Sequence, residues 1–407
     1  MNTLATPVSS APVLIVGAGP AGLALAVALA QADIGSTVLE QAPAASLDNP
    51  PEDGRDIALT HRARRVLEAL GIWQRLPAEQ IAPLRRAEVR SGASPFVLPF
   101  DAKGDGHDAL GWLVPNHLIR AACLAQARTL PAVQIVGDAR VVSLARDDTA
   151  ATLALADGRR WQAPLVVAAD SRFSALRRLA GIGAGMLDFG RTAIVARMGH
   201  ALAHDGTAHE CFAHGHTLAM LPMAGRQSSA VLTLTGDQAA GWMADTPEGF
   251  ARRVAELFDH RLGDMTLAGE RHAYPLVATY ARQFSGHRFA LVGDAAVGMH
   301  PVTAHGYNFG LYGVETLAHE LAGACRAGRD LGDAAALTRY ADAHRRATLP
   351  IYLGTNAIVR LFTDDRPPAR LLRGAVLRIA SHLPPLKAAV TRQLTGDTGG
   401  GLRRAAG

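Results

Sequence analysis

A glycine-rich turn between a buried strand and a helix is the feature that most restricts the possible folds of this chain. The apolar run Val13–Val16 stops at Gly17, and residues 17–22 read Gly-Ala-Gly-Pro-Ala-Gly. An Ala- and Leu-rich segment over 21–31 is typical of a helix, and 37–40 is typical of a second strand. This order predicts a βαβ unit, and therefore a parallel sheet with a right-handed crossover.

Each glycine of this GxGxxG pattern has its own physical reason. Gly17 allows the tight turn, Gly19 lets the backbone approach a pyrophosphate, and Gly22 lets the helix pack closely on the sheet. The helix N-terminus adds unpaired N–H groups and a partial positive charge. We therefore predict that a dinucleotide pyrophosphate is bound here by Gly17, Ala18, Gly19, Pro20, Ala21 and Gly22.

Glu40 narrows the choice of nucleotide. It ends the second strand, near the separation of about 20 residues at which a carboxylate binds the ribose. Such a carboxylate accepts hydrogen bonds from ribose hydroxyls and repels a 2′-phosphate, which favours FAD or NAD over NADP. Glu40 and the adjacent Gln41 are predicted cofactor contacts.

A second buried strand, over 288–292, ends in Gly293-Asp294, and we expect a helix of small residues to follow. Ligands bind at the carboxyl ends of strands in open α/β sheets. Asp294 is therefore a candidate acceptor for a polyol such as a ribityl chain. Capping of the helix is the alternative, and the residues alone leave both open.

Several other elements follow from local patterns. We expect a helix over 60–70 with Thr60 as N-cap and Gly71 as stop, a helix over 116–128, and a helix over 247–259. Residues 85–110 and 190–280 are predicted to be rich in strands, and Pro350 is expected to break or kink a long helix. Some apolar residues of the second region suit either a pocket lining or plain core: Phe212, Leu218, Met220, Leu221 and Met223.

Five motifs in fixed order, over about residues 12–365, resemble a known family. They are the glycine turn with Glu40, GRDIALT at 54–60, VPNHL at 114–118, VVAAD at 166–170 with Ser174 and Arg177, and GDAA at 293–296 followed by His300-Pro301 and Gly306-Tyr307-Asn308. With them the chain resembles the class A single-component flavin monooxygenases, in particular the UbiH-like hydroxylases of ubiquinone biosynthesis and their UbiM-type group.

The resemblance implies roles for further residues. It places Pro301 beside flavin and substrate, and His305 is a candidate proton acceptor, as is His300. Ser171 departs from the glycine usual in the family, which predicts a different turn after Asp170. The cofactor contacts predicted on this basis are Arg55, Asn116, Val141, Asp170, Asp294, Gly306, Tyr307 and Asn308.

The implied fold is α/β and p-hydroxybenzoate-hydroxylase-like, with a Rossmann-like FAD-binding domain interleaved with a β-rich substrate domain, plus C-terminal helices. We expect FAD binding by 1–80, 110–182 and 285–345, a substrate domain at 81–109 and 183–284, and a helical segment at 346–407.

The implied activity is hydroxylation of the aromatic ring of a polyprenylated ubiquinone precursor. NAD(P)H would reduce FAD as a transient co-substrate, and O2 would then give a flavin C4a-hydroperoxide that transfers oxygen. Three alternatives stay open: a hydroxylase of a small aromatic acid, an FAD-dependent lipid reductase, and a non-catalytic flavin-binding scaffold.

Composition and charge limit which partners and which cellular location are expected. The 41 Lys and Arg residues exceed the 36 Asp and Glu residues only slightly, so no nucleic-acid partner is expected. Cysteine and histidine spacings predict no metal. No Lys or Arg precedes Arg55 and no long apolar run occurs, which favours a cytoplasmic protein without leader or transmembrane helix. The basic tail from Arg366 onward suits either the inner face of a membrane, a quinone-biosynthesis complex, or the body of the protein.

Overall fold

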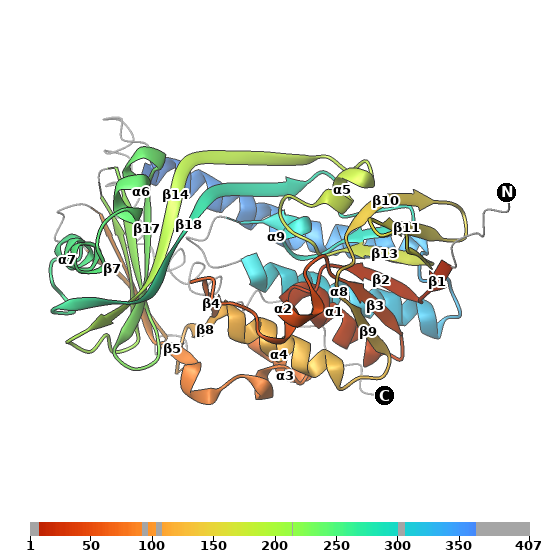
Figure 1. The fold of residues 1–407 in the computed structure, drawn as a ribbon, viewed down its shortest axis with the longest axis horizontal. Helices are drawn as coiled ribbons and strands as arrows, with labels where there is room; N and C mark the ends of the chain where they lie inside the picture. The colour runs from red at the N-terminus through yellow and green to blue at the C-terminus, as the bar shows by residue number, and fades with distance from the viewer. Residues whose placement is uncertain (1–7, 92–96, 103–107, 214, 300–305, 364–407) are drawn as a thin grey trace.

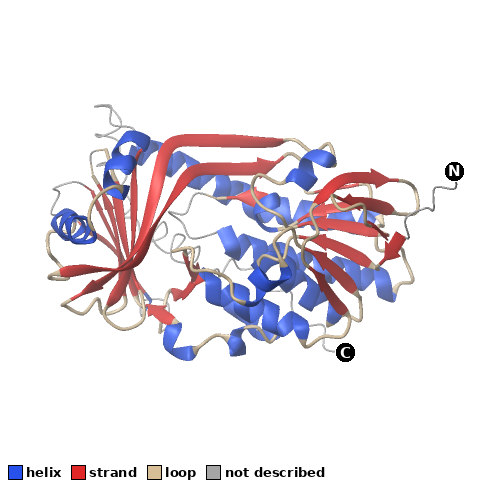
Figure 2. Cartoon of the chain, in the orientation of Figure 1, coloured by secondary structure: helices blue, strands red, loops and turns tan. Residues whose placement is uncertain are grey.

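The computed structural model describes residues 8–91, 97–102, 108–213, 215–299 and 306–363. The predicted βαβ unit is confirmed as β2 (Val13–Val16), α1 (Pro20–Ala30) and β3 (Ser36–Leu39), with β2 and β3 parallel. They belong to a six-stranded sheet, beside which Figure 2 shows both helices and strands of another sheet. Its strand order is β19 (Ser285–Gly286), β20 (Phe289–Leu291), β13 (Leu165–Ala168), β2, β3 and β9 (Val133–Val136).

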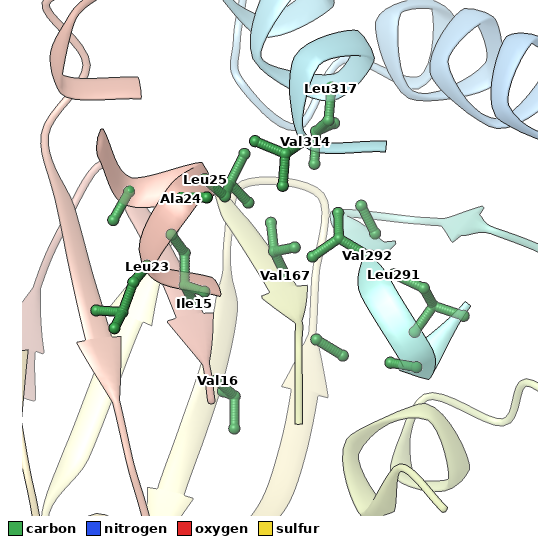
Figure 3. Close-up of a cluster of buried hydrophobic side chains, with 14 of the residues drawn as sticks. Ile15, Val16, Leu23, Ala24, Leu25, Val167, Leu291, Val292, Val314 and Leu317 are labelled. Atoms are coloured by element: carbon green, nitrogen blue, oxygen red, sulfur yellow. The ribbon is translucent and has the colours of Figure 1, made fainter. Parts of the chain in front are cut away.

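This sheet is buried on both faces, which explains why its strands are continuous apolar runs. Helix α1 packs against α4 (Asn116–Arg128) and α8 (Gly306–Arg326) as well as the sheet, so its Ala and Leu residues are buried almost all round. Figure 3 shows Leu25 of α1 beside Val314 and Leu317 of α8, with Val167 of the sheet nearby. We call these sheet and helices the parallel-sheet half.

An eight-stranded sheet forms the other half. Its two longest strands, β14 (Ala184–His200) and β18 (Met265–Ala281), have 17 residues each and extend about 55 Å, so they reach from one half to the other, as Figure 1 shows. The order is β21 (Val297–Gly298), β18, β14, β17 (Gln227–Thr235), β16 (Thr217–Pro222), β15 (Thr207–Phe212), β6 (Arg86–Ser91) and β7 (Val97–Asp101).

The two faces of this sheet have different neighbours. On the outer face, Leu218 and Met220 pack against α6 (Gly236–Met243) and α7 (Pro247–Leu257). On the inner face, Phe212 and Leu221 pack in separate clusters, and Leu221 contacts the small sheet between the two halves. Leu218 and Met220 therefore lie on one face of the sheet and Phe212 and Leu221 on the other, a division that the sequence alone did not give.

Two smaller sheets and further helices complete the described part of the chain. The small sheet has the order β4 (Asp56–Leu59), β8 (Gly111–Pro115) and β5 (Ala82–Leu84); a four-stranded sheet has the order β1 (Val8–Ser10), β12 (Arg160–Ala163), β11 (Ala151–Leu155) and β10 (Val141–Arg146). The remaining helices are α2 (Ala44–Asp48), α3 (His61–Ala69), α5 (Ala175–Leu179) and α9 (Ala334–Thr363), with 3-10 turns at Trp73–Arg75 and Ala78–Gln80.

Two local predictions are confirmed at helix ends. The Thr60 side chain accepts a hydrogen bond from the Ala63 N–H at the start of α3, and Gly71 follows that helix with φ +72°. Helix α4 has the bounds predicted from the sequence.

Two others are wrong. Helix α9 continues through Pro350, because Pro350 lies on its exposed side, where water can reach the carbonyl group left unpaired, while Thr348 and Tyr352 are buried on the packed side. The segment after β20 is a 3-10 turn, Gly293–Ala295, and not a helix, since the chain turns at once to pair β21 with β18. Helix α9 also crosses the predicted boundary at 345/346, and the domain limits otherwise stay predictions.

Candidate functional site

The glycine turn combines close packing with open space. Gly17 has φ +111°, and a Cβ there would lie 2.5 Å from the Ala169 carbonyl oxygen, while a Cβ at Gly22 would lie 2.0 Å from the Gly17 oxygen. Both positions therefore exclude any side chain. A Cβ at Gly19 would meet no atom within 4 Å. Gly19 borders the only open space among these three, which fits a ligand that approaches the backbone there.

The start of α1 suits an anion. Gly19 is the N-cap residue and provides no side-chain hydrogen bond, Pro20 occupies the first turn, and no acidic residue is present in that turn. The N–H groups of Ala21 and Gly22 point along the helix axis without an intrahelical acceptor. The turn therefore offers donors and a positive dipole end to a pyrophosphate.

Glu40 is joined to this turn. Its Oε2 accepts a hydrogen bond of 2.7 Å from the Ala18 N–H, and its Oε1 accepts one of 3.0 Å from the Ala42 N–H. The carboxylate therefore connects the end of β3 with the turn after β2, and each oxygen keeps acceptor capacity for a ribose hydroxyl. Gln41 is exposed beside it.

Asp170 lies on the other side of the turn. A Cβ at Gly17 would lie 3.0 Å from the Asp170 Cα, and Asp170 Oδ2 accepts a hydrogen bond from the Leu176 N–H. The Oδ1 atom is buried and has no hydrogen-bond partner in the described part of the chain. A buried acceptor without a partner costs about 1–3 kcal/mol, so this oxygen fits a ligand hydroxyl group. Ser171 does not take a positive φ, so this turn does not need the glycine usual in the family.

Asp294 occupies the 3-10 turn after β20, where Arg172 Nη2 donates to its Oδ2 at 3.1 Å. Arg177 stabilises this turn through a buried hydrogen bond. The residue is 3% exposed, and its Nη1 donates to the Ala295 carbonyl at 2.7 Å. Burial lowers the pKa of Arg177. Arg172 was not predicted from the sequence, where its only signal is its position two residues after Asp170.

Asp53 links two predicted cofactor residues and was also missed. Its Oδ2 accepts hydrogen bonds from Arg55 Nη2 at 2.5 Å and from Asn116 Nδ2 at 2.7 Å. The Tyr274 hydroxyl donates to the Asp53 carbonyl at 2.6 Å, which connects this cluster to β18. Burial acts to raise the pKa of Asp53, but the hydrogen bonds and charge of Arg55, with Asn116, lower it overall.

The start of α8 completes one edge of the site. A Cβ at Gly306 would lie 3.9 Å from Asp294 Oδ1. The Asn308 side chain turns inward, where it accepts a hydrogen bond from the Thr60 N–H and donates one to the Ala58 carbonyl. The Tyr307 hydroxyl lies 3.8 Å from Cys123 Sγ, and burial raises the pKa of Tyr307.

Of the other predicted residues, Val141 does not join this edge. Val141 begins β10 in the four-stranded sheet. Pro301, His305 and His300 lie outside the described residues.

Strand register explains why distant motifs meet. Val16, Leu39, Ala168 and Leu291 are paired in register across β2, β3, β13 and β20. The residues that follow them are the glycine turn, Glu40, Asp170 and Asp294, which therefore share one edge of the parallel sheet. Within the described residues there is no group of three side chains suited to a metal ion and no helix long and apolar enough to cross a membrane.

Comparisons with known proteins agree with this geometry. Residues 10–348 match the FAD binding domain family. The chain is 44% identical over 388 residues to ubiquinone hydroxylase UbiM of Neisseria meningitidis, with 94% of this chain and 84% of the relative covered. It is 37% identical to ubiquinone hydroxylase UbiL of Rhodospirillum rubrum, covering 95% and 90%.

Among solved structures, p-nitrophenol 4-monooxygenase PnpA of Pseudomonas putida superposes with a TM-score of 0.77 at 18% identity, covering 96% of this chain and 99% of that one. This likeness confirms the predicted fold class.

Proposed function

The chain belongs to the FAD binding domain family and to its ubiquinone-hydroxylase branch, and from that premise we propose that it hydroxylates the aromatic ring of a polyprenylated ubiquinone precursor. The likeness to UbiM over nearly the whole chain carries the proposal. FAD, when bound, supplies the redox chemistry that uses NAD(P)H and O2 to oxygenate an electron-rich ring.

The residues at the edge of the parallel sheet fit FAD. The turn at Gly19 and the start of α1 would hold the pyrophosphate, and Glu40 the ribose. Asp294, oriented by Arg172, would accept hydrogen bonds from the ribityl chain. The unpaired Asp170 Oδ1 offers a further acceptor.

The inner face of the eight-stranded sheet would form the substrate side. Phe212 and Leu221 make this face apolar, and it is directed toward the small sheet and the parallel-sheet half. Such an apolar surface would exclude water and bind a prenylated ring through apolar contacts. Because a polyprenyl chain resides in the bilayer, we also propose that the protein works at the inner face of the membrane, with the basic tail from Arg366 onward at the anionic surface.

Deletion of the gene in its native host tests the function. We expect a polyprenylated precursor that lacks one hydroxyl group to accumulate, as detected by mass spectrometry of the cellular quinones. The wild-type gene should restore the quinone. A Gly17→Val variant should not, because its side chain would collide with the Ala169 carbonyl group and distort the cofactor turn. An unchanged quinone profile in a host without a second hydroxylase would contradict the proposal.

A further inference from the structure

One carboxyl group on the inner face of the large sheet is surrounded by apolar neighbours. Glu210 belongs to β15, and strand register places it between Val89 of β6 and Ala219 of β16. The next residues outward in the same row are Leu98 of β7 and Val231 of β17. Neighbours in a row share a face of the sheet, so Glu210 is the single ionisable residue in a row of five across these strands.

Side-chain alternation fixes the face on which Glu210 lies. Phe212 is two residues further along β15 and packs with Leu98 and with Leu361 of α9. Ala219, the partner of Glu210 on β16, is two residues before Leu221, which packs with Leu113 of the small sheet. Since residues i and i+2 share a face, Glu210 lies between these two apolar clusters on the inner face.

In the described strands of the large sheet, the other charged residues lie on distant strands or on the opposite face. Arg197 and His272 share the inner face but belong to β14 and β18, three and four strands away, about 14 and 19 Å. Asp56 of the small sheet pairs with Arg197. On the outer face, Glu88 forms an ion pair with Arg90, and its carboxylate lies 3.4 Å from Nδ1 of His209, whose ring packs edge-on against Phe258.

The carboxyl group itself has no hydrogen bond or ion pair with another described residue, although its side chain stays partly accessible. Burial alone raises the pKa of Glu210 to about 8. A carboxyl group in apolar surroundings without a partner is unfavourable for folding. Glu210 therefore combines partial accessibility with apolar neighbours on both adjacent strands.

We propose that Glu210 binds the hydroxyl group of a neutral phenolic substrate and accepts its proton. The inference rests on the proposed function and specifies its substrate. The O–H bond on the ring oxygen breaks, its electron pair stays on that oxygen as a phenolate, and a new O–H bond forms on the Glu210 carboxylate. The phenolate ring is richer in electrons and so more readily oxygenated. The proton returns to solvent after the product leaves.

The charges of the residues in the row that contains Glu210 favour one class of substrate. A carboxylate with a pKa near 8 is closer in basicity to a phenol than an ordinary carboxylate is, which favours proton transfer. An aromatic acid would bring a negative charge into this apolar row, and the row from Leu98 to Val231 contains no cation to receive it. The site therefore favours a phenol without a carboxyl group.

The test compares the FAD-loaded wild type with Glu210→Gln, which keeps the shape and removes the proton acceptor. The substrate is a phenol that bears a short prenyl chain, and hydroxylated product, NAD(P)H oxidation and H2O2 are measured from pH 6 to 9. We expect wild-type kcat/KM to rise with pH through about 8. Glu210→Gln should lose that rise and form product about 10²–10⁴-fold more slowly. Glu210→Asp should retain the rise at a reduced rate.

Matched controls separate the possible failures. Glu270→Gln changes an exposed carboxylate on β18 of the same sheet and should keep wild-type rates. Flavin content and the thermal midpoint of each variant show whether it is folded. Glu210→Leu, which removes an unpaired polar group, should raise the thermal midpoint while losing product.

If the wild type forms product and Glu210→Gln matches it in rate and pH profile, the assignment of Glu210 is overturned but the proposed function stands. If the wild type forms no product from any phenol tested, both are overturned.

Discussion

His344 is fully buried between α8 and α9, and neither ring nitrogen has a hydrogen-bond partner in the described part of the chain. Phe284, Tyr312 and Tyr340 surround the ring, and Gly313 leaves it just enough room. Burial lowers the pKa of His344 to about 3. A protonated imidazole cannot be accommodated there, so the folded protein binds this proton far less readily than the unfolded chain.

This predicts a loss of stability in acid. The pKa of His344 is depressed below that of an unfolded histidine, near 6.5, so its contribution to stability is present above that value and is lost as the pH falls toward 3. Between pH 8 and pH 5, wild type should lose about 2 kcal/mol more unfolding free energy than His344→Leu. Urea unfolding at both pH values measures this. A similar effect from replacing the exposed His319 would refute the explanation.

At the scale of single elements, the start of α8 is held by one side chain. Asn308 Oδ1 accepts from the Thr60 N–H at 3.0 Å, and its Nδ2 donates to the Ala58 carbonyl at 2.8 Å. The amide thus connects α8 to the junction of β4 and α3. The sequence predicts Asn308 as a cofactor contact, but its side chain is turned toward these backbone groups, so a contact of Asn308 with FAD stays a prediction.

We expect Asn308→Ala to lower the free energy of unfolding by about 2–4 kcal/mol, because two buried backbone groups lose their partners. Thr60→Ala is the control: it removes only the cap on Ala63 and should cost about 1 kcal/mol. Equilibrium unfolding in urea compares the two. Equal losses would mean that the Asn308 bonds contribute no more than an ordinary helix cap.

At the scale of the whole molecule, the two halves are joined by the long strands β14 and β18 and by polar contacts at the small sheet. Asp56 of β4 is almost fully buried there, with its Oδ1 3.5 Å from Arg197 Nη2 on β14. This distance is too long for a strong hydrogen bond. Burial therefore outweighs the attraction of Arg197 and raises the pKa of Asp56 to about 6.

The raised pKa predicts the opposite pH trend to that of His344. The contribution of Asp56 is present below its unfolded pKa, near 3.9, and is lost as the pH rises through about 6. Asp56→Asn should therefore gain stability relative to wild type between pH 4 and 7, by up to about 3 kcal/mol, and the difference should be constant above pH 7. Urea unfolding over this range checks it. A difference that does not change with pH would show that Asp56 titrates normally.

Local chemistry accounts for most of what the sequence predicted correctly. The glycine turn, Glu40 and the helix ends at Thr60 and Gly71 depend on neighbouring residues, and strand register then brings Asp170 and Asp294 to the same edge. The wrong expectation at Pro350 has the same origin: a helix-breaking propensity was overruled by packing on the other side of α9.

The sequence by itself therefore determined the parallel sheet, the dinucleotide edge and the order of the motifs, because these follow from short apolar runs and turn residues. Only the tertiary structure decided which face of the large sheet each side chain occupies. It separated Phe212 and Leu221 from Leu218 and Met220, and placed Glu210 in an apolar row without a partner. The reason is physical: alternation assigns residues to two faces, but what covers each face depends on helices and strands that are remote in sequence.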